Sequence, residues 1–404
     1  MSNKNRVPNI RFMGFKGEWA EKKFINCLAK IIDFRGKTPK KLGLSWSNNG
    51  KYRALSALNV KNGFIDKNID VHFGNYDLYK KWMGNTELEK GDILFTTEAP
   101  MGNIAIIKDD EKYILSQRTI AFRVDEKNIN GSFLLYKLNT VSTKNKLMSL
   151  STGGTAQGIS QKNLSYLFIS VSNDLNEQQK IGDFFSKLDK LLDLQQQKID
   201  KLELLKKALL QKLFPRHDAK IPELRFKGFE GDWNEKRLNS ITKRLDNYRK
   251  PITANKRLSG QTPYYGANGI QDYVKGYTHE GEFVLIAEDG ANDVRNYPVR
   301  FVKGYIWVNN HAHVLQAKVG TSNNLFLAYS LKNRNLLPYL VGSGRMKLNA
   351  DVLMNLLLKI PDLNEQQKIG NLLSKVDQLI ELENKKLQNF QQVKKCLLQN
   401  MFVE

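Results

Sequence analysis

Cysteine is nearly absent from this sequence of 404 residues, which contains only Cys27 and Cys396. Two cysteines so far apart in the chain exclude a disulfide framework and a cysteine-rich metal site. No apolar run approaches the roughly 18 residues that a membrane-spanning helix needs. The N-terminal MSNKNRVPN also lacks the apolar core of a signal peptide. The sequence therefore predicts a cytoplasmic protein with no membrane-spanning helix.

Acidic residues are also few: 41 Asp and Glu stand against 63 Lys and Arg, which gives a net charge of +22. A positive surplus of this size is typical of proteins that bind polyanions. Hydrophobic residues make up 41% of the chain, so large cores can form. The length favours two domains over one.

Catalytic motifs are missing as well. RGKT at 35–38 ends like a phosphate-binding loop, but the glycine that such a loop needs would fall on Ile31. His311 and His313 have no carboxylate or cysteine at a matching spacing, so packed or solvated strand histidines are favoured over metal ligands. No Asn-Pro-Pro or Asp-Pro-Pro motif of adenine methyltransferases occurs. We therefore expect no catalytic residue, no metal and no cofactor in this chain.

What the sequence does contain is an internal repeat. DLNEQQKIG occurs at 174–182 and again at 362–370. Residues 7–24 align without gaps on residues 221–238 and match at nine of eighteen positions. The chain is therefore a tandem of two units, each with an aromatic opening segment, a variable stretch, the motif and a long helix. The predicted parts are a first domain, a central helix, a second domain and a C-terminal helix, at 1–175, 176–214, 215–363 and 364–404.

The two helices are predicted from caps and periodicity. Asn176 followed by Gln179 resembles a capping box, and a run of about 35 residues gives a helix of about 50 Å. Apolar residues at heptad spacing are expected to pack helix against helix: Ile181, Phe184, Leu188, Leu191, Leu202, Leu205, Leu209, Ile369, Leu372, Val376, Leu379, Phe390, Val393 and Leu397. A third apolar row would suit more than one partner helix: Phe185, Leu192, Ile199, Leu373, Ile380 and Leu387. Because acidic residues nearly balance the lysines, a structural helix pair is favoured over a DNA-gripping helix.

The variable stretches predict an α+β fold of two mixed α/β domains. Short strands bounded by Gly, Asp and Asn are expected at ILFTTEAP, NIAIIK and TIAFRV in the first domain, and at FVLIAE, VRFVKG and HVLQAK in the second. SQKNLSYLFISV and NADVLMNLLLKIP each predict a short helix followed by a strand. Divergent stretches on a repeated frame indicate one task performed twice on different ligands.

The repeated frame, DFRGKTP at 33–39, YYGANGI at 264–270 and the two DLNEQQKIG helices resemble the specificity subunit of type I restriction-modification enzymes. The resemblance covers nearly the whole chain. It implies two target recognition domains with pseudo-two-fold symmetry, each reading half of a bipartite double-stranded DNA site, and two antiparallel helices that act as a ruler.

The same resemblance implies partners. Two methyltransferase subunits and two restriction subunits would join this chain, and the S-adenosylmethionine, ATP and Mg would be used by those partners. In this interpretation, the two DLNEQQKIG helix starts give one docking site to each methyltransferase subunit. The alternatives are a nonspecific nucleic-acid scaffold and, less favoured, an enzyme that modifies nucleic acid.

Candidate DNA-binding residues of the first domain are cationic or amide side chains in polar loops. Cations around a proline turn suit phosphate oxygens, although a solvated surface turn is the simpler alternative: Arg35, Lys37, Lys40 and Lys41. In the glycine-containing loop 151–163, Gln157 suits an adenine edge and Lys162 a phosphate.

The second domain offers similar candidates. VGSGRMKLN at 341–349 supplies Arg345, suited to guanine, and Lys347. Asn268, Asn292 and Arg295 lie in turn-rich polar stretches and are candidates for base edges. A plain flexible connection is an equally simple interpretation of both glycine loops. Trp19 and Trp233 are expected to pack in the domains rather than stack on bases.

Overall fold

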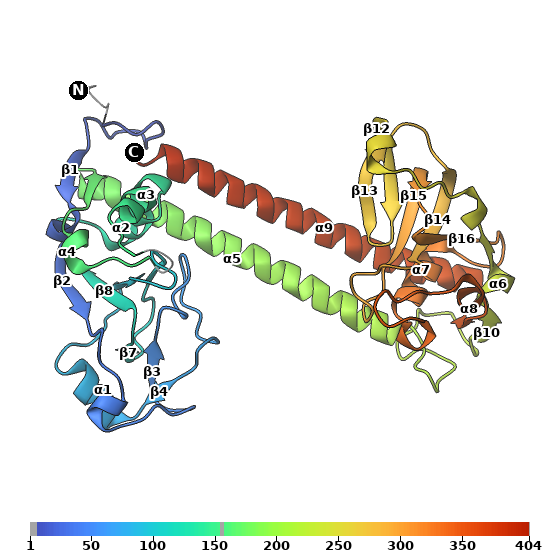
Figure 1. Ribbon diagram of the computed structural model, residues 1–404, viewed down its shortest axis with the longest axis horizontal. Helices are drawn as coiled ribbons and strands as arrows, with labels where there is room; N and C mark the ends of the chain where they lie inside the picture. The colour runs from blue at the N-terminus through green and yellow to red at the C-terminus, as the bar shows by residue number, and fades with distance from the viewer. Residues whose placement is uncertain (1–5, 154–156, 404) are drawn as a thin grey trace. The chain divides into compact units, whose positions relative to one another are not determined.

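The computed structural model describes residues 6–153 and 157–403. Two helices of 38 residues each, α5 (Leu175–Lys212) and α9 (Leu363–Asn400), confirm the predicted long helices (Figure 1). No described helix is both long enough and apolar enough to span a membrane.

The chain divides into two compact units. Unit 1 comprises Met1–Gln195 and Leu387–Glu404, and unit 2 comprises Gln196–Lys386. These units differ from the four consecutive segments expected from the sequence. Each unit combines the start of one long helix with the end of the other.

The strands of unit 1 are β1 (Ala20–Lys23), β2 (Leu28–Asp33), β3 (Tyr52–Leu55), β4 (Phe73–Gly74), β5 (Ile93–Thr96), β6 (Ile104–Ile106), β7 (Tyr113–Leu115), β8 (Thr119–Val124) and β9 (Phe168–Val171). They form a four-stranded sheet in the order β2-β8-β5-β6, a three-stranded sheet in the order β4-β3-β7, and the pair β1-β9. The short helices are α1 (Tyr76–Met83), α2 (Gly131–Leu138), α3 (Val141–Ser149), α4 (Gln161–Leu164), η1 (Phe24–Cys27) and η2 (Lys40–Leu42).

The strands of unit 2 are β10 (Asn234–Arg237), β11 (Thr242–Arg244), β12 (Ser259–Gly266), β13 (Gly269–Val274), β14 (His279–Ala287), β15 (Val299–Val308), β16 (Ala312–Ala317) and β17 (Leu357–Ile360). Six of them form one sheet in the order β11-β16-β14-β15-β12-β13, and β10 pairs with β17. The short helices are α6 (Leu238–Ile241), α7 (Asn324–Lys332), α8 (Ala350–Met354), η3 (Asp246–Tyr248), η4 (Ala254–Lys256) and η5 (Leu337–Tyr339).

The two units share one plan despite their different sequences. The order β2-β8-β5-β6 in unit 1 corresponds to β11-β16-β14-β15 in unit 2, and all of these pairings are antiparallel. The pair β1-β9 corresponds in the same way to β10-β17. The strands and the two helix–strand segments expected from the sequence are therefore confirmed, as is the α+β class with two mixed domains.

The central strand of each sheet separates two cores. In β5, Ile93 and Phe95 face one core, while Leu94 belongs to the other. In β14, Val284 and Ile286 face one core, while Phe283 and Leu285 belong to the other. Successive side chains of a strand point to opposite faces, so a continuously apolar strand is expected wherever both faces are covered. This burial places the ends of β5 and β14, and the loops that follow them, at fixed positions.

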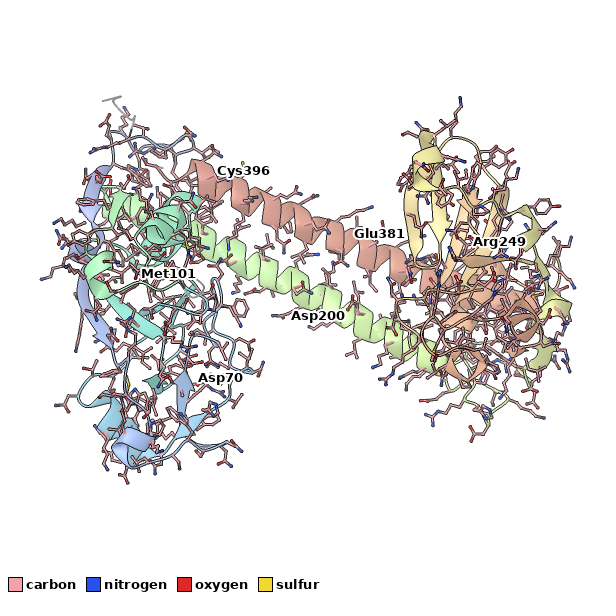
Figure 2. All side chains as sticks on the ribbon, in the orientation of Figure 1. Asp70, Met101, Asp200, Arg249, Glu381 and Cys396 are labelled. Carbon is pink, nitrogen blue, oxygen red and sulfur yellow. The ribbon has the colours of Figure 1, made fainter. Side chains whose placement is uncertain are left out.

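The long helices run antiparallel where they meet within each unit. In unit 2, Lys198 pairs with Glu383, and Lys206 pairs with Asp377. In unit 1, Asp189 pairs with Lys394. Glu383 is 2% exposed and also accepts from Lys386 at 3.2 Å, so an ion-paired carboxylate is buried among the apolar residues of α9. Asp200 and Glu381, labelled in Figure 2, are exposed residues of the two helices in unit 2.

The buried stripe follows a period of 3.6 residues rather than the predicted heptad. Ile181 and Ile199 are each 2% exposed, and Ile369 and Leu387 are 1% and 9% exposed. Each pair is separated by five turns at 3.6 residues per turn. The third apolar row therefore supplies much of the seam, with Phe185 and Leu373 both at 0% exposure.

Four predicted packing residues rotate out of this stripe. A straight helix drifts by about 20° per heptad from a 3.5-residue repeat, so heptad positions leave the contact face along its length. The residues are 38–49% exposed: Leu191, Leu205, Leu379 and Val393. The other predicted packing residues are buried or half-buried: Ile181, Phe184, Leu188, Leu202, Leu209, Ile369, Leu372, Val376, Phe390 and Leu397.

The DLNEQQKIG motifs hold the opening segments on the long helices. Arg11 donates to the two carboxylate oxygens of Glu177 at 2.6 and 2.8 Å, and Arg225 donates to those of Glu365 at 2.9 and 2.8 Å. Both glutamate side chains are 0% exposed. The hydrogen bond from Arg225 to Glu365 raises the pKa of Arg225. A buried ion pair with this geometry joins two distant segments of each unit.

Other residues of the motif contact a short helix in each unit. Gln178 accepts from the backbone N–H of Asn130, just before α2, and Gln366 accepts from that of Asn323, just before α7. Gly182 and Gly370 let these helices approach closely. A Cβ at Gly182 would lie 2.9 Å from Phe133 N, and one at Gly370 would lie 3.0 Å from Phe326 N. The motif thus makes contacts within each unit, and the expectation that its two helix starts dock partner subunits stays a prediction.

The predicted capping box is also wrong. Asp174 Oδ1 accepts from Asn176 N at 2.8 Å, and Asp362 Oδ1 accepts from Asn364 N at 2.9 Å. Aspartate two residues earlier therefore caps each helix. Gln179 instead accepts from Asn130 Nδ2 at 2.6 Å.

One core of each unit contains the residues that follow a long helix of the other repeat. In unit 1, Phe402 packs against Trp19 and Phe133, with ring centroids 6.1 and 5.3 Å apart. In unit 2, Phe214 packs against Trp233 and Phe326 at 6.1 and 5.4 Å. Trp19 and Trp233 are only 1% and 3% exposed, which confirms their predicted packing role.

Candidate nucleic-acid interface

The basic turn after β2 is held by Asp33. Arg35 donates to Asp33 through Nε and Nη2, at 2.9 and 2.5 Å, and Gln161 Nε2 donates to the same carboxylate at 2.7 Å. Burial opposes ionisation of Asp33, but the hydrogen bonds from Arg35 and Gln161 outweigh it and lower its pKa. Asp33 thereby joins the basic turn to the helix that contains Lys162.

The lysines of this turn have different environments. Lys37 Nζ lies 2.5 Å from the carbonyl oxygen of Trp82 and 4.6 Å from the centroid of the Phe34 ring, so it supports the local fold. Lys41 Nζ donates to the Gly36 carbonyl at 2.8 Å. Lys40 and Lys41 are exposed. These two lysines are therefore better placed than Lys37 to meet a phosphate.

The glycine loop of unit 1 lies against the loop that follows β5. Gly158 forms backbone bridges with Glu98 and with Thr152. Glu98 also pairs with Arg118 at 3.2 Å. Gln157 and Lys162 are exposed at this edge, and residues 154–156 of the loop lie outside the described residues.

In unit 2, Asn268 and Asn292 come together across two loops. Asn268 Nδ2 donates to the Gly290 carbonyl at 2.9 Å and to Asn292 Oδ1 at 3.2 Å, and Asn268 Oδ1 accepts from Asn292 N at 2.8 Å. Arg300 Nη2 donates to the Asn268 carbonyl at 3.0 Å. Arg295 is exposed on the same loop as Asn292, with its backbone N–H bound to Asp293. The three candidates thus lie in one loop cluster.

Arg345 and Lys347 join this cluster through acidic partners. Arg345 Nη2 lies 3.2 Å from Asp289 Oδ1 and 3.1 Å from His311 Nδ1. Lys347 Nζ lies 2.9 Å from Glu288 Oε1. The side chain of Arg345 is 60% exposed, so its guanidinium remains accessible to a ligand while Asp289 orients it.

His313 lies in a buried charged group beneath these loops. Its Nε2 donates to the Leu348 carbonyl at 2.8 Å, and its Nδ1 lies 2.7 Å from Asp246 Oδ2. Burial opposes ionisation of Asp246, but the contact with His313 outweighs it and lowers the pKa of Asp246. The pKa of Glu288 is lowered in the same way against burial, by Arg249 and Lys347.

Asp246, Glu288 and His313 bring ligand-type atoms within 4.8 Å of one another. Arg249 Nη1, however, lies 2.7 Å from Glu288 Oε2 and donates to the Ala312 carbonyl at 2.9 Å. A guanidinium therefore already supplies positive charge to the oxygen that a metal would need. The sequence spacing around His313 does not indicate this carboxylate, because Asp246 comes from a distant segment of the chain.

The two loop clusters have the same construction. Glu98 lies two residues after β5 and Asp289 lies two residues after β14. Each bridges the glycine-containing loop, through Gly158 in unit 1 and Lys347 in unit 2. Each carboxylate also holds an arginine, Arg118 and Arg345 respectively. Both units thus present cations and amides beside the same end of the central strand, and such groups bind phosphates and base edges.

The sequence model of the family described as type I restriction modification DNA specificity domain matches residues 17–204 and 230–392. The chain belongs to this family. The two matches correspond to the two repeats, and each includes one loop cluster. The resemblance drawn from the sequence is confirmed.

Named relatives support the same family. A Haemophilus influenzae protein, named as a type I restriction enzyme specificity subunit, is 47% identical over 146 residues, which span 36% of this chain and 37% of that protein. A Methanocaldococcus jannaschii protein, named as the specificity subunit of the type I restriction enzyme MjaX, is 25% identical over 381 residues, 82% of this chain and 83% of its own length. The crystal structure of the type I restriction-modification S subunit from M. genitalium has a TM-score of 0.68 at 18% identity, covering 98% of this chain and 99% of that one. That last likeness shows the fold of the specificity subunit.

Several residues of the two clusters were not identified from the sequence. Asp289 and His311 contact the candidate Arg345. Gln161 contacts Asp33, which holds Arg35, and Arg118 pairs with Glu98. Their partners lie far away in the sequence, and no local motif marks them. Only the pairing of equivalent strands, which the structure shows, relates Glu98 to Asp289.

Proposed function

We propose that this chain is the DNA-reading subunit of a type I restriction-modification enzyme. Each unit reads one half of a bipartite double-stranded site. Partner subunits then methylate adenine and cleave DNA under the direction of this chain. The observation that carries the proposal is the pair of loop clusters, which share a construction but carry different side chains.

Electrostatics support a DNA ligand. The net charge is +22. Cationic side chains that contact DNA phosphates release counterions, which makes the free energy of binding more favourable. In unit 1 the exposed cations include Arg35, Lys40 and Lys41, and in unit 2 they include Arg295 and Arg345. Exposed phosphate-binding cations supply position and affinity, whereas Gln157 and Asn292 offer exposed amides that suit adenine edges, and Asn268 orients Asn292.

Exposed leucines on the long helices support partner docking. In unit 1, Leu191 and Leu194 on α5 are 43% and 53% exposed, and Val393 on α9 is 49% exposed. The equivalent positions of unit 2 are exposed as well, with Leu379 at 38%, Leu382 at 49% and Leu205 at 47%. Two equivalent apolar patches suit two copies of one helical partner. We assign the docking of the two methyltransferase subunits to these patches.

The proposal gives the chain no catalytic step. Methyl transfer would need S-adenosylmethionine, and restriction would need ATP and Mg, which the two methyltransferase and two restriction subunits would bind. Rigorously purified chain should therefore neither methylate nor cleave DNA. Methyl transfer by the chain alone would contradict this part of the proposal.

A domain exchange tests the central claim. Residues 25–173 would be replaced by the matching domain of another specificity subunit, with its partner subunits present. Single-molecule methylation sequencing of the host genome should show one changed half-site and one unchanged half-site, because β1 and the long helices lie outside the exchanged residues and are retained. A change in both half-sites would contradict independent reading. Methylation without sequence preference would favour a nonspecific scaffold instead.

A further inference from the structure

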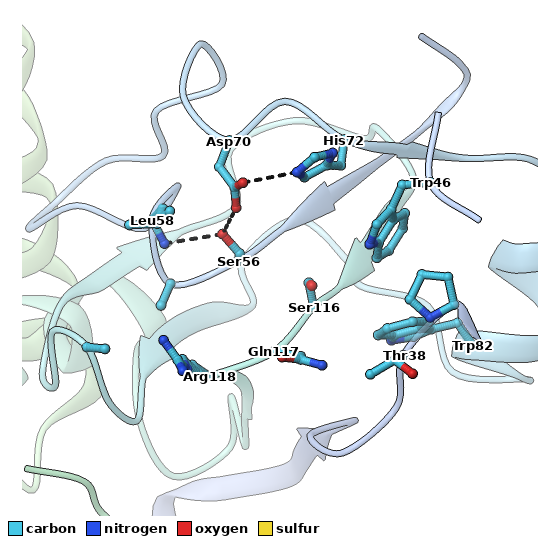
Figure 3. Close-up of a pocket in the computed structure, with 13 residues that line it drawn as sticks. Thr38, Trp46, Ser56, Leu58, Asp70, His72, Trp82, Ser116, Gln117 and Arg118 are labelled. Atoms are coloured by element: carbon cyan, nitrogen blue, oxygen red, sulfur yellow. Dashed lines mark hydrogen bonds and ion pairs between the residues drawn. The ribbon is translucent and has the colours of Figure 1, made fainter. Parts of the chain in front are cut away.

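Unit 1 contains a cavity of about 520 Å³ with an aromatic wall (Figure 3). Trp46 stacks on His72 with ring centroids 6.2 Å apart and planes 25° apart, and its ring lies 5.3 Å from that of Trp82. Trp82 is fully buried, whereas Trp46 is half-buried. Part of the Trp46 ring is therefore accessible from the cavity.

Polar groups line the same cavity. The hydroxyls of Thr38 and Ser116 and the amide of Gln117 offer hydrogen-bond donors and acceptors (Figure 3). Asp70 also lines it, with Oδ1 3.2 Å from His72 Nε2 and Oδ2 bound to the Ser56 hydroxyl. The carboxylate is thus paired within the protein, so it does not by itself demand a cationic ligand.

Backbone conformation singles out this cavity independently of its side chains. Among the described residues, three non-glycine residues have positive φ: Asp70 at 48°, Ala99 at 50° and Arg118 at 62°. All three line the cavity. Residues other than glycine rarely adopt a backbone conformation with positive φ. Those that do are concentrated at active sites and ligand-binding sites.

Positive charge surrounds the mouth of the cavity. Arg118 lines it, and Thr38 and Pro39 of the basic turn also line it. Lys40 and Lys41 follow directly in η2 and are exposed. Arg118 pairs with Glu98 at 3.2 Å, so a ligand phosphate would compete with one exposed carboxylate.

We propose that this cavity, the Trp46 pocket, binds one nucleotide, with the base against Trp46 and the phosphate near Arg118 and Lys40. An aromatic ring accepts the face of any base, and the neighbouring amide and hydroxyls select its edge. The volume lies within the roughly 300–1,000 Å³ typical of small-ligand sites. The nucleotide comes either from DNA, as a base that leaves the helix stack, or from solution. The DNA source rests on the function proposed above.

The test uses the full chain with DNA that contains the mapped site. In one arm, 2-aminopurine replaces each base of the half-site read by unit 1, one position at a time. In the other arm, equilibrium dialysis measures binding of AMP, GMP, CMP and TMP. We expect one 2-aminopurine position to change its emission at least twofold on binding, or one free nucleotide to bind measurably. The arm that responds identifies the source.

Two variants connect either signal to the pocket. Trp46→Ala should remove the signal and weaken binding of that ligand roughly tenfold, because base stacking on an aromatic ring is lost. Trp46→Phe, the matched control, should retain most of both. Gln117→Ala changes an exposed side chain outside the hydrophobic core, so it tests the pocket even where the Trp46→Ala protein fails to fold. It should alter which base gives the signal.

Three results overturn the proposal. They are no response in either arm, a response that Trp46→Ala leaves unchanged, and equal loss with Trp46→Phe and Trp46→Ala. Failure of the pocket is separate from failure of the proposed function. If the wild-type chain still prefers its own site over scrambled DNA, the function stands without the pocket. If it shows no preference, the function itself fails.

Discussion

The two units agree closely where they hold the long helices and differ where their loops are exposed. Arg11 with Glu177 and Arg225 with Glu365 repeat the same hydrogen bonds. The turn around Arg35 in unit 1 has no sequence equivalent in the loops around Asn268 in unit 2. The repeated Arg–Glu pairs thus make internal contacts, whereas the divergent loops on the same frame carry the side chains that differ between the two units.

The largest expected effect comes from removing the repeated Arg–Glu pair in one unit. Glu177→Ala removes the partner of Arg11 and leaves its guanidinium charge unpaired. Removing one member of a buried ion pair lowers the free energy of unfolding by about 3–5 kcal/mol. Hydrogen exchange should show faster opening of the start of α5 in unit 1. The equivalent segment of α9 in unit 2 should be unaffected.

A double replacement provides the control for this loss. Changing Arg11→Met together with Glu177→Leu removes both charges and should restore much of the stability. Glu177 also accepts from Trp19 Nε1 at 3.2 Å and from Ser172 Oγ at 2.5 Å. Glu177→Gln should therefore lower the free energy of unfolding by more than Glu365→Gln does. Equal costs in the two units would show that these additional contacts contribute little.

The next effect concerns the divergent loops. Arg345→Ala removes an accessible guanidinium that Asp289 orients, and a good bidentate base contact is worth about 1–3 kcal/mol of discrimination. We expect relaxed recognition at one position of the half-site read by unit 2. Competition binding against all single-base variants of the site would measure it. Lys40→Ala is the matched comparison, because a phosphate contact should weaken binding evenly and reduce its salt dependence.

A smaller effect comes from the glycines of the repeated motif. Gly182→Ala and Gly370→Ala each place a Cβ within about 3 Å of backbone nitrogen in α2 or α7. Overpacking of this kind costs about 1–3 kcal/mol, of which about 1 kcal/mol is offset by the better helix propensity of alanine. Urea denaturation should give similar losses for both variants. Lys201→Ala, at an exposed position of α5, is the control and should be nearly neutral.

The smallest expected effect is a difference between the two units in how their stability depends on pH. Burial lowers the pKa of His279 in unit 2 from its ordinary value of 6.5. The unfolded chain therefore takes up the proton first, so stability is lost as pH falls below 6.5, by up to about 1.4 kcal/mol per pH unit. The carboxylates of Asp246 and Glu288 have lowered pKa values, so their stabilisation is lost only below pH 4.5.

Hydrogen exchange of β14 and β5 at pH 7 and pH 5.5 measures this difference. We expect β14 of unit 2 to lose more protection than β5 of unit 1, whose described core contains no buried histidine. His279→Gln should reduce the difference. Equal loss in the two strands would show that His279 does not govern the acid response.

The sequence predicted the fold well because its signals are local or repeated. Buried strands such as Ile93–Thr96 are short apolar runs, and the long helices carry continuous periodicity. The heptad assignment failed at Leu191 and Leu205 because a 3.5-residue period and a 3.6-residue period differ little over two turns but diverge over ten. Only the packed helix pair shows which residues the accumulated rotation turns outward.

The binding surface was less predictable because its contacts are long-range. Asn268 and Asn292 were both identified as candidates, but their mutual hydrogen bonds depend on the sheet that brings two loops together. Lys37 looks like its neighbours in the sequence, yet its ammonium group is bound to Trp82. The positive φ of Ala99 and Arg118 leaves no trace in composition or spacing.

The helix ends that complete the cores also set the order in which the protein can mature during synthesis. The core of unit 1 includes Met401, Phe402 and Val403, which pack near Trp19. At about 5–20 residues per second, the ribosome adds Phe402 roughly 20–80 s after Trp19. Unit 2 ends at Lys386, so all of its residues are made earlier. The N-terminal unit is therefore the last to complete its core, and a nascent chain exposes that unfinished apolar surface to chaperones until translation has passed residue 403.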